Sequence, residues 1–206
     1  MTAAERQISQ SSRPKGDKRV RTRAALLEAA RALVGERGFE RTTLQAVAER
    51  AGMTIGAIYG NFQNRDDLFV ALGETYWAPI KPRIRADSSF AEKMRALAEA
   101  YLAVLPDRRD AAFGRLTGMA HALGHEALRR EIQAVTAASF ASGAAWLKSV
   151  ADEGGLPMPA ETLVVVIHSL AEGLMFQRFL TPELVPDQVF YAAFEALAGG
   201  AAPSKR

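Results

Sequence analysis

The chain has 206 residues and a net charge of +3, with 49% hydrophobic and 24% charged residues, an ordinary globular composition. Because the sequence contains no cysteine, it excludes disulfides, thiolate zinc sites, thiol nucleophiles and iron–sulfur clusters, and it suits a reducing cytoplasm. The longest purely aliphatic run, residues 163–167, is far shorter than the roughly 20 residues of a membrane helix, and no apolar stretch near the N-terminus predicts a secretory signal. We therefore expect a cytoplasmic protein with no membrane partner.

Positive charge is concentrated at the start of the chain. Residues 1–67 hold 12 Lys and Arg against 8 Asp and Glu, a net charge of +4, whereas residues 68–206 sum to −1. We expect residues 1–20 to form a flexible basic arm. Such an arm is usually a solvated tail, and contact with nucleic acid or another polyanion is the alternative.

The first part of the chain has the pattern of short helices separated by glycines. An apolar stripe with helical spacing predicts a helix over about residues 18–37 that Gly38 closes. The T-x-x-Q sequence from Thr42 to Gln45 is typical of a capping box and predicts the start of a second helix, which Gly52 ends.

Two more helices are expected before the first prolines. Thr54 is a good N-cap and predicts a short helix in the segment 54–62, and a fourth helix opens at Asn64 and is stopped by Pro79 and Pro82. A short helix, a glycine turn and a second short helix together indicate a helix-turn-helix.

Every long segment beyond the prolines is also helical by pattern. We expect helices over residues 89–105, 107–123, 126–153, 159–180 and 186–198. The helix over 159–180 is apolar around its circumference, which indicates burial on more than one side. The helices over 159–180 and 186–198 are either the core of one bundle or the surface through which two copies form a homodimer.

Three stretches carry a family resemblance: T-R-A-A-L-L-E-A-A-R-A-L from residue 22, G-F-E-R-T-T-L-Q-A-V-A-E-R-A-G-M-T-I-G-A-I-Y-G-N-F, and N-R-D-D-L. With this order and spacing, residues 22–72 closely resemble the TetR family of transcriptional regulators. The resemblance implies an all-α fold, with an N-terminal three-helix helix-turn-helix DNA-binding domain over 21–67. It implies a C-terminal α-helical domain over 68–206 that binds an effector and dimerises.

The resemblance also implies a set of DNA-binding residues. They are Thr43, Thr54, Ile55, Gly56, Ala57, Tyr59, Asn61 and Arg65. Thr43, Tyr59 and Arg65 match positions that contact phosphate, and residues 54–57 begin the recognition helix that reaches base edges in the major groove. Ile55 stands where the family often has a basic or polar residue, and Asn61 replaces a common histidine. Base recognition is therefore expected to be sparse and partly apolar, with DNA shape contributing.

Each of these residues also has a purely structural interpretation. Tyr59 and Phe62 could be core residues, and Thr54 could be only an N-cap. Gly56 and Gly60 each cost about 1 kcal/mol in a helix interior. Close approach of the backbone to DNA would explain them, and so would relaxed packing against the first helix.

Polar, aromatic and methionine side chains of the C-terminal helices are candidates for an effector site. The candidates are Tyr101, Phe113, Met119, Trp146, His168, Glu172, Met175 and Phe176. Most such residues at helical spacing are only core, and His168 with Glu172 could be a mutually satisfied buried pair. His121 and His125 have metal-binding spacing, but Gly124 lies between them and no third ligand is apparent, so no metal site is predicted.

The expected function is a homodimeric repressor that binds a palindromic double-stranded DNA operator and is released by an unknown small-molecule effector. No nucleophile motif such as G-x-S-x-G is present, so we expect no enzymatic activity and no cofactor. The alternatives are an activator or a ligand-independent regulator of the same family. An all-α small-molecule-binding protein or enzyme with a vestigial helix-turn-helix is a third.

Overall fold

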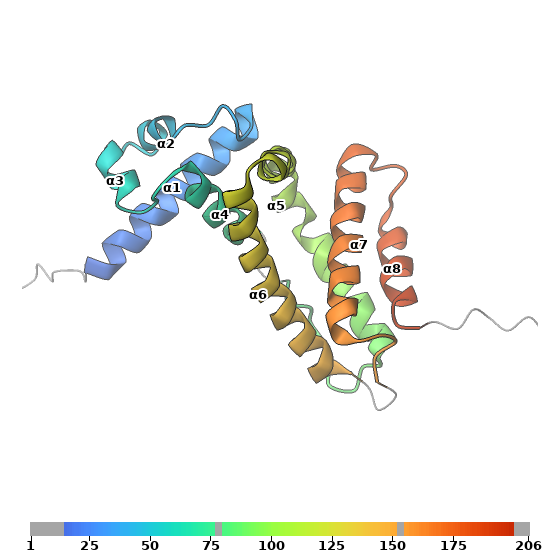
Figure 1. Cartoon of the computed structure of the whole chain (residues 1–206). Helices are drawn as coiled ribbons and strands as arrows, with labels where there is room; N and C mark the ends of the chain where they lie inside the picture. The colour runs from blue at the N-terminus through green and yellow to red at the C-terminus, as the bar shows by residue number, and fades with distance from the viewer. Residues whose placement is uncertain (1–14, 77–79, 152–154, 200–206) are drawn as a thin grey trace, which may run out of the picture. The chain divides into compact units, whose positions relative to one another are not determined.

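The computed structural model describes residues 15–76, 80–151 and 155–199 (Figure 1). All elements in these ranges are helices, which confirms the predicted all-α fold. The chain divides into two compact units, Met1–Leu72 and Gly73–Arg206. Residues 1–14 of the predicted arm and the predicted helix stop at Pro79 lie outside the described ranges. The boundaries predicted after residues 20 and 67 stay predictions.

The N-terminal unit contains α1 (Lys15–Arg37), α2 (Leu44–Arg50), α3 (Ile55–Tyr59) and the first part of α4 (Arg65–Tyr76). The first helix begins at Lys15 rather than near residue 18, so residues 15–20 of the predicted arm are helical. Asn64 precedes α4 as predicted, and its Oδ1 accepts a hydrogen bond from the Asp67 amide at 2.8 Å. Buried apolar residues of α1, α2, α3 and the segment after α3 make a small core. It includes Leu26, Ala30, Val47, Ile58 and Phe62.

The predicted capping box of the second helix is wrong. Thr43, not Thr42, is the N-cap of α2, and its Oγ1 accepts a hydrogen bond from the Ala46 amide at 3.2 Å. Thr42 is buried and donates its hydroxyl proton to the Gly38 carbonyl at 2.9 Å. Gln45 donates to Glu49 along the helix instead of returning to the cap. Only Thr42 has a glutamine three residues later, but Thr42 is buried, and the exposed Thr43 caps the helix without a capping-box partner.

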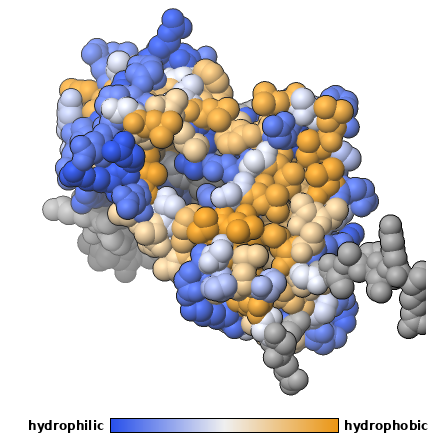
Figure 2. Space-filling model, turned by 45° about the vertical axis from the view of Figure 1, so that its right-hand side comes forward, coloured by the Kyte–Doolittle hydropathy of each residue, from blue (hydrophilic) through white to orange (hydrophobic). Residues whose placement is uncertain are grey.

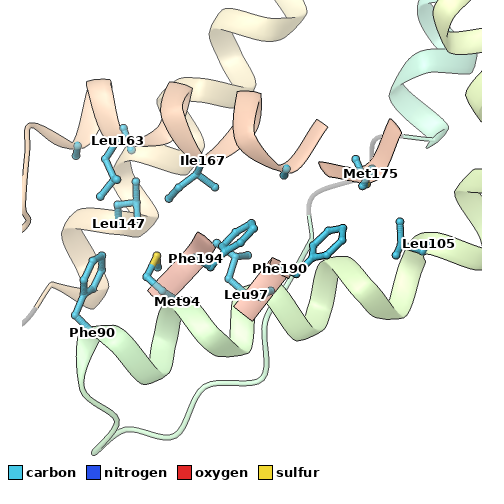
Figure 3. Close-up of a cluster of buried hydrophobic side chains, with 14 of the residues drawn as sticks. Phe90, Met94, Leu97, Leu105, Leu147, Leu163, Ile167, Met175, Phe190 and Phe194 are labelled. Atoms are coloured by element: carbon cyan, nitrogen blue, oxygen red, sulfur yellow. The ribbon is translucent and has the colours of Figure 1, made fainter. Parts of the chain in front are cut away.

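The C-terminal unit contains α5 (Phe90–Gly124), α6 (Glu126–Val150), α7 (Ala160–Leu180) and α8 (Asp187–Ala196). Side chains from all four helices form one buried apolar cluster (Figure 3). Phe190 and Phe194 of α8 are fully buried in it. Ser89 caps α5 in a capping box with Glu92, so the hydroxyl and the carboxylate satisfy amides at the helix start.

The sequence predicts a helix break between residues 105 and 107, but α5 continues through Pro106. A proline inside a helix removes one backbone hydrogen bond and tends to kink the helix. Pro106 is exposed, and α5 changes direction along its length (Figure 1). Packing of both halves against α7 and α8 outweighs the local preference for a break.

α7 is long and apolar enough to cross a membrane by length and composition alone, a test that core helices of soluble proteins also pass. Five of its 21 residues belong to the buried cluster: Ala160, Leu163, Ile167, Ala171 and Met175. These positions recur at intervals of three, four, four and four, which is one face of a helix. In this structure α7 is a packed helix of a four-helix unit, and its other faces are only partly covered.

Candidate functional site

A tight glycine turn joins α2 to α3. Gly52 has a φ of +64°, in the left-handed region that side chains rarely adopt. The turn is closed by the Met53 amide, which donates to the Ala48 carbonyl at 2.9 Å. A helix, a turn of this kind and a second short helix make the predicted helix-turn-helix geometry.

α3 separates its side chains into an inward and an outward face. Ile58 and the following Phe62 are fully buried, whereas Tyr59 keeps 60% of its surface exposed. Thr54 caps the helix by accepting from the Ala57 amide at 3.3 Å. The core interpretation therefore holds for Phe62 and fails for Tyr59. Five of the eight predicted DNA-binding residues are exposed, and all but Thr43 lie at or near α3: Thr43, Thr54, Ile55, Gly56 and Tyr59.

Packing inside the protein does not explain the glycines of α3. A Cβ atom built on Gly56 would meet only the Thr54 Oγ1 at 3.8 Å, which is an ordinary contact. A Cβ atom on Gly60 would meet only carbonyl oxygens of Gly56 and Ala57, at 3.4 and 3.6 Å. Neither position touches α1, so relaxed packing against the first helix is wrong as an explanation. The exposed Gly56 leaves the helix backbone open to a partner from outside.

Asn61 is half-buried at the end of α3. Its side-chain amide donates to the Ala57 carbonyl at 2.8 Å, and its own carbonyl accepts from Arg23 at 2.8 Å. The Arg23 guanidinium also lies over the Phe62 ring, 4.4 Å from its centre. Sequence analysis counted Arg23 only as part of the basic stretch and missed that it holds the end of α3. No local pattern signals a contact between residues 38 positions apart.

Arg65 is half-buried and interacts with neighbouring residues. Its Nη1 donates to the Glu40 carbonyl at 3.2 Å, and its guanidinium lies 4.5 Å from the centre of the Phe39 ring. A contact between the same guanidinium and a DNA phosphate would have to compete with these interactions. Its predicted role and that of Ala57, which is also half-buried, stay predictions.

The C-terminal unit contains a second group of polar residues, held between α5 and α7. Arg115 donates from Nε and Nη2 to the Glu172 Oε1, at 3.1 and 3.0 Å. Arg108 is buried, with 7% of its surface exposed, and its Nη1 lies 3.8 Å from the Met175 Sδ. Tyr101 is near both Arg108 and Glu172, and burial raises the pKa of its hydroxyl.

His168 belongs to the same group. Its Nε2 is 3.8 Å from the Glu172 Oε2, and its ring makes a T-shaped contact with the Phe140 ring. Burial lowers the pKa of His168, which the Glu172 carboxylate partly opposes and the charges of Arg115 and Arg108 reinforce. The predicted pairing with Glu172 exists, but the closer partner of that carboxylate is Arg115.

Sequence analysis missed that Tyr101 and two arginines lie on the same face of one helix. Tyr101, Arg108 and Arg115 follow one another at intervals of seven, which places them on one face of a continuous helix. The break predicted at Pro106 put Tyr101 on a different helix from the two arginines. The unbroken α5 aligns Tyr101 with Arg108 and Arg115, neither of which was a candidate.

The remaining candidates are scattered over the unit. Trp146 packs against the buried cluster, and Phe176 is half-buried with its ring near Phe179. Phe113 and Met119 are exposed on α5, with 52% and 37% of their surfaces accessible. The effector role of these four residues stays a prediction.

His121 and His125 lie side by side with stacked rings 3.6 Å apart. The His125 Nδ1 is 2.7 Å from the His121 carbonyl oxygen. Within the described ranges no group of three or more His, Asp or Glu side chains could hold a metal ion. The pair is a stacking contact where α5 meets α6.

Comparison with known proteins gives a family match for the N-terminal unit. Residues 26–72 match the family described as bacterial regulatory proteins, tetR family. The chain is 33% identical over 84 residues to the HTH-type transcriptional repressor AcnR of Corynebacterium efficiens, covering 41% of this chain and 44% of AcnR. It is 51% identical over 51 residues to the HTH-type transcriptional regulator TtgR of Pseudomonas putida, covering 25% and 24%. The matched stretches thus span less than half of each relative.

The similarity extends over the whole fold at lower identity. The crystal structure of NalD, the secondary repressor of the MexAB-OprM multidrug efflux pump in Pseudomonas aeruginosa, superimposes with a TM-score of 0.58 at 24% identity. The likeness covers 90% of this chain and 99% of NalD. The family match is confined to residues 26–72, which include the helix-turn-helix, whereas the likeness to NalD covers most of the fold.

Proposed function

We propose that this chain, which belongs to the TetR family of bacterial regulatory proteins, is a repressor that binds a palindromic operator as a homodimer and is released by a small molecule. The observation that carries the proposal is the outward face of α3, where a capped helix start exposes Thr54, Ile55 and Gly56 beside Tyr59. A recognition helix reads the major groove with the residues at its N-terminal end. The relatives named above are regulators of transcription, in agreement with the prediction that the chain is not an enzyme.

The exposed apolar surface of the C-terminal unit supports dimerisation. Val165 and Leu180 of α7 are 41% and 73% exposed, and Leu184 in the following loop is 76% exposed. Figure 2 shows a broad area of apolar residues in the right half of the view. Soluble monomers rarely expose large continuous apolar patches, so a second copy is the partner that we propose for α7 and α8.

The two-fold axis of such a dimer would present two copies of α3 to successive major grooves, roughly 34 Å apart. α4 contains residues of both compact units, because the division falls between Leu72 and Gly73. In this proposal an effector bound among α5 to α8 changes the spacing of the two helix-turn-helix heads through α4. A coupling of about 1–3 kcal/mol would weaken operator binding about 5- to 150-fold, which is enough for induction. We also propose that the protein is cytoplasmic, because a regulator of bacterial chromosomal genes acts there.

The experiment that tests the proposal maps where the protein sits on its own chromosome and measures binding to those fragments. We expect palindromic sites, salt-sensitive binding and raised transcription of the neighbouring genes in a deletion strain. Tyr59→Phe removes only the exposed hydroxyl and should weaken binding about tenfold on every sequence, the value of one hydrogen bond to a charged group. Tyr191→Phe in α8 is the matched control and should bind as the wild type does.

Two outcomes contradict the proposal. Lowered transcription of the bound genes in the deletion strain identifies an activator. Absence of any specific, salt-sensitive binding to DNA leaves an all-α small-molecule-binding protein as the function.

A further inference from the structure

The first turns of α1 carry a dense group of positive charges. Residues 15–23 hold five Lys or Arg and one Asp, a net charge of +4. All of them belong to α1, so these charges sit on a helix and not on the flexible arm that the sequence predicts through residue 20. They also precede residues 26–72, which match the family, so the family match assigns them no role.

Arg23 fixes this part of α1 against the end of α3. The Arg23 Nη1 donates to the Asn61 carbonyl at 2.8 Å, and the guanidinium lies 4.4 Å from the centre of the Phe62 ring. α1 continues beyond this contact for about two more turns, to Lys15 (Figure 1). The basic turns are therefore a helical continuation of the N-terminal unit, anchored beside α3.

Arg19 lies on the face of α1 that packs against the helix-turn-helix. Arg19, Arg23, Leu26 and Ala30 follow one another at intervals of four, three and four, which is one face of a helix. Leu26 and Ala30 are fully buried in the small core of the N-terminal unit. Arg19 thus points to the same side of α1 as the core, one turn (roughly 5.4 Å) further toward the N-terminus than Arg23.

The positive charge of Arg19 is not neutralised inside the protein. Its side chain is exposed, and it forms no ion pair within the described ranges. Arg50 of α2, by contrast, is also exposed but is held by Glu36 through hydrogen bonds of 2.8 and 2.7 Å. Arg19 can therefore bind an anion outside the chain without breaking an internal pair.

We propose that Arg19 binds a phosphate of duplex DNA beside the groove that α3 enters, so that the first turns of α1 are a rigid extension of the DNA-binding surface. α3 and its cap contain no Lys or Arg, whereas neutralised phosphates supply a large share of the affinity of a protein for DNA. A guanidinium also matches the geometry of a phosphate. The inference rests on the proposed function for its partner, double-stranded DNA.

The test measures how binding of the full-length protein to DNA depends on salt. The probes are a chromosomal fragment that the protein occupies and a duplex of the same length with the same bases in shuffled order. Each neutralised phosphate adds about 0.9 to the slope of log affinity against log salt concentration. A dimer has two copies of Arg19, so Arg19→Gln should reduce the slope by about 2 on both duplexes. At 0.1 M salt this is a loss of affinity of about 10- to 100-fold.

Arg21→Gln is the matched control, because it removes the same charge from an exposed arginine of the same turn. A shift of two residues turns a side chain by about 200° around a helix, which places Arg21 on the opposite face from Arg19. Arg21→Gln should keep the slope of the wild type. Arg19→Lys retains the positive charge and should also keep most of the slope.

Val20→Pro tests whether the contact needs the helix. Val20 is 67% exposed, so the change leaves the core intact, but a proline here removes a helical hydrogen bond and unwinds the turn before it. Val20→Pro should weaken binding to both duplexes about as much as Arg19→Gln does. Thermal unfolding checks that the N-terminal unit of each variant is folded.

An unchanged salt slope in Arg19→Gln, an equal loss in Arg21→Gln, or wild-type affinity in Val20→Pro would overturn the inference. These results leave the repressor proposal standing wherever the wild type prefers its chromosomal fragment to the shuffled duplex. Equal binding of the wild type to both duplexes contradicts the repressor proposal, and the slope of Arg19→Gln still decides the phosphate contact. Absence of binding to either duplex overturns both proposals.

Discussion

Both compact units have an apolar core, but they differ in one exposed face and in one buried charge. The N-terminal unit buries Ile58 and Phe62 and exposes the polar or small residues Thr54 and Gly56. The C-terminal unit buries the charged Arg108 and exposes Val165, Leu180 and Leu184. An exposed polar face suits contacts with DNA that water and salt can compete for, whereas an exposed apolar face suits a second protein copy.

The largest expected effect comes from the apolar face. Val165→Arg places a charge at an exposed position of α7 and should not disturb the buried cluster. If α7 forms the dimer interface, the charge is desolvated only in the dimer, so the variant should be monomeric at micromolar concentration. Analytical ultracentrifugation measures this. Loss of bivalent binding should also weaken operator affinity by about 100-fold or more.

Val135→Arg provides the control for this change. Val135 of α6 is also exposed, at 37%, and the substitution is the same. It should leave a dimer with full operator affinity. A dimer in both variants would show that α7 is not the interface.

A smaller effect is expected on the DNA face. Gly56→Ala adds a methyl group that meets only the Thr54 Oγ1, so the N-terminal unit should be as stable as before or gain up to about 1 kcal/mol from helix propensity. The same methyl group would separate the helix backbone from DNA, and operator affinity should fall about tenfold, or about 1.4 kcal/mol. Thermal unfolding and a DNA-binding titration measure the two quantities separately.

Gly73→Ala is the matched change in α4, where the added Cβ has no atom within 4 Å. It should leave operator affinity unchanged. Unaltered affinity in Gly56→Ala would mean that the backbone at residue 56 does not approach DNA closely.

The smallest effect concerns the buried polar group. Because the pKa of His168 is lowered from 6.5, the unfolded chain binds more protons than the folded chain as the pH falls below about 6.5. Stability that is present above pH 6.5 is therefore lost as the pH falls through the lowered pKa. His168→Asn should flatten the pH dependence of the unfolding free energy between pH 7 and pH 5, measured with urea. His125→Asn, at an exposed histidine, should keep the slope of the wild type.

Local sequence patterns predicted the N-terminal unit well. The glycine turn at Gly52, the cap at Thr54 and the inward residues Ile58 and Phe62 are each decided within a few positions, so a motif is enough to place them. The capping box at Thr42 failed because burial of that threonine depends on the rest of the unit. The contact between Arg23 and the end of α3 joins distant residues and has no local signal.

The candidate site of the C-terminal unit was predicted less completely. His168 and Glu172 were named from their spacing on one helix and Met175 from its residue type, and the structure brings Glu172 to Arg115 and Met175 to Arg108 on another helix. Proline is a strong local signal for a helix end, and here tertiary packing overrides it at Pro106. Which face of α5 meets α7 depends on that continuity.

The sequence by itself determined the helical class, the helix-turn-helix and the resemblance of residues 22–72 to the TetR family, because all three follow from periodicity and short-range motifs. Only the tertiary structure decided that α5 runs unbroken, that two arginines join Tyr101 beside α7, and that the glycines of α3 serve no internal packing. The physical reason is the range of the interactions. Caps and turns act over three or four residues, whereas burial of a charge or of an apolar face depends on residues that lie dozens of positions apart.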